Sequence, residues 1–117
     1  METRRQKMNA VERGIAEELA LIHLVDIGYK PLLRNYECEV GTIDVIAKKD
    51  GQLFFFAVLV NDHTTITQKR KMVSVAAYYI KRYGIATIPV AFATATVSLT
   101  SGEVYVKEWT IQKREAK

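Results

Sequence analysis

The sequence predicts an α/β (α+β) protein built on one mixed five-stranded sheet flanked by helices. Two stretches have the apolar spacing of helices, five others have the composition of strands, and turn signals separate them. Along the chain they follow the order helix, three strands, helix, two strands. An Asp-Gly pair after the second strand predicts a tight antiparallel hairpin. An uninterrupted apolar run predicts that the third strand is central.

The first helix is expected over about residues 9–27. Asn9 and Glu12 have the spacing of an N-terminal capping box, and Gly28 is a natural stop. Apolar side chains recur at helical spacing, and we expect them to form its buried stripe: Ile15, Leu19, Ile22 and Val25.

Three strands should follow. "KPLLRNYECEV" at 30–40 is extended, with its proline near the start, where a missing donor matters least. "TIDVIAKK" at 42–49 is the second strand and "LFFFAVLV" at 53–60 the third. Alternation along the second strand divides its side chains between two faces: Ile43, Val45 and Ala47 on one, and Thr42, Asp44 and Ile46 on the other.

The second helix is expected over residues 65–83, before Gly84. Its inward side chains should be those at helical spacing: Met72, Ala76, Tyr79, Ile80 and Tyr83. "ATIPVAFATATVSL" at 86–99 and "EVYVKEWTI" at 103–111 then predict two strands in a hairpin.

Composition limits the classes of protein. A chain of 117 residues, 49% hydrophobic, suits a single domain over residues 1–117, with flexible basic ends. No apolar stretch is long enough to span a membrane, and the charged start does not resemble a secretory signal, so we expect a cytoplasmic protein without a membrane partner. One cysteine and two histidines exclude an intrachain disulfide and disfavour a zinc site.

The charge balance is basic, with 17 Lys and Arg against 13 Asp and Glu. Such an excess suits a polyanionic partner, although an ordinary solvated surface explains it equally well. The candidate nucleic-acid-binding residues are Lys48, Lys49, Lys69, Arg70 and Lys71. The last three begin the second helix, where the helix dipole favours anions. Cations at this end of the helix therefore suggest a binding site for an external phosphate.

Several motifs carry a resemblance to a known family. Glu17 stands three residues before Ala20, Arg34 and Asn35 form an R-N pair, and residues 41–44 read "GTID" before the Asp-Gly hairpin and a basic helix. In this order, over about residues 12–83, they resemble the YraN-like family of small bacterial proteins, relatives of the Holliday-junction resolvases. The resemblance implies a restriction-endonuclease-like fold.

The resemblance also implies a site of the PD-(D/E)xK type, in which carboxylates hold Mg²⁺ and a lysine assists cleavage of a phosphodiester. Carried over by position, Asp44 and Glu17 match the catalytic and metal-binding carboxylates. Four other positions depart from the pattern: Thr42 and Ala57 replace glutamates, Leu59 replaces the lysine and Asn61 replaces an arginine. Asp44 alone would make a poor metal site, and a solvated acid on an edge strand is the structural alternative.

Three functions stay open. The first is a nuclease-like protein that is catalytically inactive or impaired, needs no cofactor, and binds DNA, branched nucleic acid or a protein partner. The second is an active Mg²⁺-dependent endonuclease or junction resolvase with relocated groups, for which Asp62 and Lys69 are candidates. The third is a structural or oligomerisation module, such as a homodimer, that does not bind nucleic acid.

Overall fold

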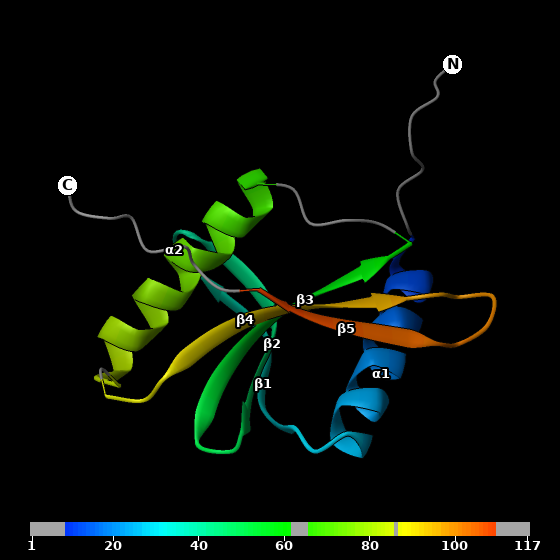
Figure 1. Ribbon diagram of the computed structural model, residues 1–117. Coiled ribbons are helices and arrows are strands. Elements are labelled where there is room, and N and C mark those ends of the chain that lie inside the picture. The colour runs from blue at the N-terminus through cyan, green and yellow to red at the C-terminus, as the bar shows by residue number, and fades with distance from the viewer. Residues whose placement is uncertain (1–8, 62–65, 86, 110–117) are drawn as a thin grey trace.

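The computed structural model describes residues 9–61, 66–85 and 87–109 (Figure 1). The two basic chain ends, Asp62 and His63 lie outside these ranges. The predicted order of elements is confirmed. The elements are α1 (Ala10–Asp26), β1 (Lys30–Cys38), β2 (Gly41–Lys49), β3 (Gln52–Val60), α2 (Ile66–Tyr83), β4 (Val90–Val97) and β5 (Val104–Trp109).

The sheet has five strands in the order β1-β2-β3-β4-β5, so β3 is central, as its apolar run predicts. Neighbouring strands are antiparallel except β3 and β4, which are parallel and joined through α2. A parallel pair needs such a crossover, because the chain must return to the starting edge of the sheet. Asp50 and Gly51 both have positive φ, at 51° and 77°, which is the backbone of the predicted two-residue hairpin between β2 and β3.

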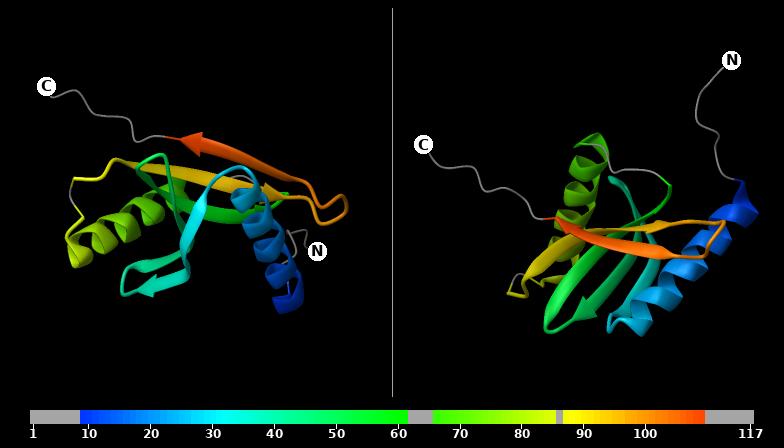
Figure 2. Two further views of the ribbon diagram at one scale, coloured as in Figure 1. Left: turned by 90° about the horizontal axis from the view of Figure 1, so that it is seen from below. Right: turned by 45° about the vertical axis from the view of Figure 1, so that its right-hand side comes forward.

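The two helices cover opposite faces of the sheet (Figure 2). Alternate residues of β3 divide between two hydrophobic clusters. Phe54 and Phe56 pack with α1, and Leu53 and Phe55 pack with α2. Neither described helix is long and apolar enough to cross a membrane.

The predicted buried stripe of α1 is wrong. Ile15, Ile22 and Val25 are exposed, and Leu19 is only half-buried. Instead α1 packs on the sheet through fully buried side chains: Ala16, Ala20 and Leu24. Both stripes have helical spacing. The stripe with the alanines faces the sheet because their small side chains let the helix lie close against the aromatic residues of β3.

Three smaller predictions also differ from the structure. Ile43, which lies beyond the end of the ladder between β2 and β3, packs with Ile46 on the α2 side and not with Val45 and Ala47. Tyr83 is exposed at the last residue of α2, whereas Val75 is fully buried. The fourth strand is shorter than its predicted run, and β4 begins only after Pro89, which lacks a backbone donor. The predicted end of the last strand, at residues 110–111, lies outside the described residues.

Candidate functional site

The candidate site lies where β2 and β3 separate. Their ladder runs from the hairpin pair Lys49 and Gln52 to the pair Val45 and Phe56, and β3 then continues beside β4 alone as far as Val60. Where the ladder ends, the Asp44 side chain replaces the missing backbone acceptor of β2, and its Oδ2 accepts a hydrogen bond from the backbone N–H of Val58 at 2.7 Å. The side chain thereby satisfies a backbone donor that β2 no longer reaches.

A single arginine joins Asp44 to α1. Arg13 donates through Nη2 to Oδ1 of Asp44 at 3.0 Å and through Nε to Oε2 of Glu17 at 3.1 Å. Arg13 and Glu17 lie one helical turn apart, so their side chains are neighbours on the same side of α1. The structure thus brings the two predicted carboxylates together around one guanidinium.

Burial sets the protonation of Asp44. Loss of solvent raises the pKa of the Asp44 carboxyl, and the nearby negative charge of Glu17 raises it further. The Val58 N–H and the Arg13 guanidinium lower this pKa. The net direction is upward from the ordinary value. The negative charge of Asp44 is therefore costly in this place even with both of its partners present.

Asp44 faces a cavity of about 340 Å³. The residues of interest along its wall come from β2, β3 and both helices: Arg13, Thr42, Asp44, Ala57, Leu59 and Lys71. Three of the four positions that depart from the nuclease pattern therefore share one cavity with Asp44. The fourth, Asn61, lies outside this lining, is exposed, and donates its backbone N–H to the carbonyl of Val97.

The residues present do not fit the Mg²⁺ that the family resemblance implies. Magnesium needs several hard oxygen ligands around an octahedron. Each oxygen of Asp44 already accepts a hydrogen bond, Glu17 holds Arg13, and Ala57 and Leu59 offer no ligand atom. Within the described ranges, no group of three His, Cys, Asp or Glu side chains could hold a metal ion.

Of the two residues considered as relocated groups, only Lys69 belongs to the part of the chain that the structure describes. Asp62 lies outside the described residues. The ammonium of Lys69 sits 5.0 Å from the centre of the Trp109 ring, in a cation–π contact on β5. Lys71, two residues further along α2, is the lysine that lines the cavity.

The five candidate nucleic-acid-binding residues fall into two groups. Lys48 and Lys49 lie at the hairpin end of β2, about 13 Å and about 17 Å along the strand from Asp44 at the usual rise per residue. Lys49 is held there, 4.6 Å from the centre of the Tyr29 ring. The remaining three lie on the first turns of α2: Lys69, Arg70 and Lys71. Of the five, only Lys71 belongs to the cavity that holds Asp44.

Arg13 is the residue that sequence reasoning missed. It is the only lysine or arginine in the sequence of α1, and it precedes Glu17 by the four residues that favour an ion pair. That spacing was a visible signal for the pair with Glu17. The contact with Asp44, 31 residues further along the chain, has no counterpart in local spacing.

The family model and the similar curated proteins all indicate the same family. The model of the uncharacterised protein family UPF0102 matches residues 16–97. A UPF0102 protein of Wolinella succinogenes is 33% identical over 103 residues, which are 83% of this chain and 93% of that protein. A UPF0102 protein of Clostridioides difficile is 29% identical over 102 residues, covering 79% and 90% of the two chains.

Two solved structures are similar at a lower level. One is described as the structure of an EndoMS-dsDNA2 complex, with a TM-score of 0.49, 17% identity, and coverage of 84% of this chain and 38% of that one. The other is a repair endonuclease from Pyrococcus abyssi, with a TM-score of 0.44, 15% identity, and coverage of 83% and 40%. This chain thus spans less than half of either protein.

Proposed function

The chain belongs to the uncharacterised protein family UPF0102, the YraN family that its motifs resemble, and on that premise we propose that it is a nuclease-like protein that binds nucleic acid without cutting it. The single observation that carries the proposal is the Arg13 guanidinium between Glu17 and Asp44. A cation from the chain itself stands where the family pattern would lead one to expect a metal.

Loss of cleavage follows from the chemistry of the cavity wall. In a metal-dependent nuclease the ion stabilises the charge that develops on the phosphate, and a lysine assists. Here the matching wall positions are Ala57 and Leu59, which do neither. Removal of one preorganised charged group commonly reduces a rate by about a hundred- to a thousandfold. Because two are missing and a guanidinium competes for the remaining acid, we expect no measurable turnover.

Retained binding rests on the cationic side of the same cavity. The formal net charge is +4, and Arg70 and Lys71 are exposed near the start of α2. The first turn of α2, as far as the structure describes it, holds no acidic residue, so no carboxylate there offsets the positive end of the helix dipole. Lys71 and the Thr42 hydroxyl line the cavity and offer hydrogen-bond donors to a phosphate oxygen.

The proposal is tested by measuring cleavage and binding on one set of labelled DNAs: a single strand, a duplex and a four-way junction. Each is incubated with purified protein and Mg²⁺ or Mn²⁺, and binding is followed by fluorescence anisotropy at several salt concentrations. We expect no cleavage, and affinity that falls linearly in log–log form as salt rises.

Asp44→Ala distinguishes the alternatives. Metal-dependent cleavage by the wild-type protein that disappears in Asp44→Ala would establish the active endonuclease instead. Absence of binding to every DNA and to RNA at low salt would refute the binding half of the proposal and favour a structural module.

A further inference from the structure

The outward face of α1 is apolar where a helix on the surface of a monomer is usually polar. Four aliphatic side chains project away from the sheet and stay exposed, with exposed fractions of 71% for Val11, 49% for Ile15, 64% for Ile22 and 57% for Val25. They lie on the side opposite the buried contacts of α1 with the sheet. Single exposed apolar residues are ordinary, but four of them aligned on one face of a helix mark a surface that another molecule covers.

The row has the spacing of a helix–helix seam. Together with Glu18, the four residues occupy positions 11, 15, 18, 22 and 25, which are separated by steps of four, three, four and three. That alternation keeps side chains on one line when two helices pack along their length. We call these five residues the α1 seam.

We propose that the α1 seam binds the α1 seam of a second copy of this chain, with the two helices antiparallel about a twofold axis at Glu18. The seam reads Val-Ile-Glu-Ile-Val in both directions. A twofold contact brings the same patch of both subunits together, so its surface must be complementary to itself. In this arrangement Val11 opposes the partner's Val25, and Ile15 packs beside the partner's Ile22.

Charge at the centre of the seam suits the same occupant. Glu18 lies 3.6 Å from Arg34 of β1, measured from Oε2 to Nη1, and the two side chains are 58% and 47% exposed. Two glutamates alone would repel each other at the axis. With an arginine beside each glutamate, the two subunits instead present two positive and two negative groups, and each Glu18 can pair with the partner's Arg34.

Gly14 supports a close approach of two helices. It lies within α1, and a Cβ added there would meet nothing within 4 Å among the residues that the structure describes, so packing among these residues gives no reason for a glycine. Glycine in a helix costs about 0.5–1 kcal/mol relative to alanine. In the antiparallel pair the partner's Ile22 comes opposite Gly14, where the absence of a side chain leaves room for it.

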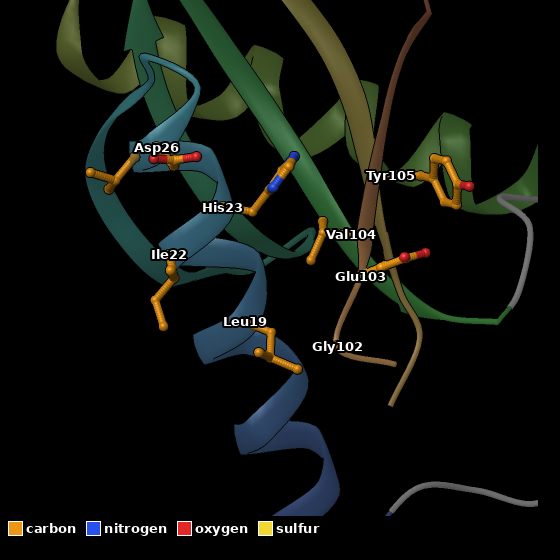
Figure 3. A pocket seen from close by; sticks show the side chains of 9 residues that line it. Leu19, Ile22, His23, Asp26, Gly102, Glu103, Val104 and Tyr105 are labelled. Carbon is orange, nitrogen blue, oxygen red and sulfur yellow. The ribbon is translucent and has the colours of Figure 1, made fainter. Parts of the chain in front are cut away.

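A groove beside the seam extends the contact surface toward β5 (Figure 3). Its volume is about 620 Å³, and it runs between the second half of α1 and the start of β5. Leu19 and Ile22 form one wall, and Val104 and Tyr105 form the other. The Tyr105 side chain is exposed but points away from α1 (Figure 3), so Val104 is the apolar side chain that this wall offers to a partner helix.

The oligomeric state in solution tests the proposal. Sedimentation velocity between about 1 and 300 μM spans the range in which a dimer of micromolar Kd forms. We expect the mass to rise from 13.3 kDa toward twice that value with concentration. Ile22→Lys should raise Kd at least about 100-fold, because it places a charge in the apolar seam of each subunit. Ile66→Lys is the matched control, since Ile66 is equally exposed but lies on α2.

Two further variants test the geometry of the contact. The circular dichroism melt of Ile22→Lys shows whether this variant folds normally. If it does not, Glu18→Arg and Arg34→Glu are used in its place. Each of these substitutions alone should weaken association, and the two together should restore it. Glu18→Cys in a Cys38→Ser background should form an intermolecular disulfide quickly under mild oxidation, because an axial residue faces its own copy. Ile66→Cys in the same background should not.

Three results would overturn the proposal. One is a protein that stays monomeric at every concentration. Another is a dimer that Ile22→Lys leaves intact, or that Ile66→Lys weakens equally. The third is a dimer in which Glu18→Cys crosslinks no faster than Ile66→Cys.

Discussion

The Asp44 carboxylate accepts the backbone N–H of Val58 at 2.7 Å, at the point where the ladder between β2 and β3 ends. Its other oxygen accepts from Arg13 of α1. One side chain therefore joins β2, β3 and α1. The residue that most resembles a nuclease ligand in the sequence holds three elements of this chain together.

Asp44→Ala should lower the free energy of unfolding by about 1–3 kcal/mol, because it leaves the Val58 N–H without its acceptor. Asp44→Asn keeps an oxygen in that place and should cost less. Urea denaturation of the two variants beside the wild type measures both values. Equal stability of Asp44→Ala and wild type would show that the bond to Val58 contributes nothing.

The raised pKa of Asp44 predicts how stability changes with pH. Burial is its largest cause. Between the unfolded pKa and the higher folded pKa, the folded protein holds more protons than the unfolded chain, so the contribution of Asp44 to stability falls as pH rises through that window. The window begins near the ordinary value of 3.8 and extends above it.

Asp44→Asn removes this titration and supplies the comparison. The stability of wild type relative to Asp44→Asn should decrease as pH rises from about 3 to 6, measured by denaturation at each pH. If wild type instead gains on the variant over that range, attraction to Arg13 outweighs burial and the pKa of Asp44 is lowered.

Two substitutions in the cavity should together create a metal-binding site. Arg13→Gln removes the guanidinium, and Ala57→Glu adds a carboxylate to the cavity wall beside Asp44. The double variant should bind Mn²⁺ and gain thermal stability from it, by about 2.7 kcal/mol at a hundredfold excess of metal over Kd. Arg13→Gln with Ala57→Gln has nearly the same shape without the new charge and should show no gain. Equal responses of the two variants would refute this interpretation of the cavity.

The two basic groups should contribute unequally to nucleic-acid binding. Lys71 lines the cavity, whereas Lys48 lies at the hairpin end of β2. Lys71→Ala should weaken binding to duplex DNA and reduce the slope of log affinity against log salt by about 0.9, as expected for one lost phosphate contact. Lys48→Ala should change the slope little. A larger effect of Lys48→Ala would move the binding surface to the hairpin.

The order of elements could be predicted because it depends on local signals. The Asn9 cap, the Asp50-Gly51 turn and the apolar run of β3 each act within a few residues. The inward face of α1 could not be predicted in this way, since two stripes compete and only the sheet decides between them. Ala16 and Ala20 pack there because the phenylalanines of β3 fill the space that larger helix residues would need.

The candidate site was predictable in its carboxylates but not in its chemistry. Sequence motifs pointed to Asp44 and Glu17, and the structure gathers both around one group. That group is Arg13, whose contact with Asp44 joins α1 to β2 across the folded chain. Such a contact is set by tertiary packing and leaves no period in the sequence.

The claim that Arg13 has taken the place of a metal is tested most directly by titrating the wild-type protein with Mn²⁺ and with Mg²⁺ in an isothermal calorimeter. We predict no saturable binding up to about 10 mM metal, a range that would reveal a site of millimolar Kd. Stoichiometric binding that disappears in Asp44→Ala would contradict the claim.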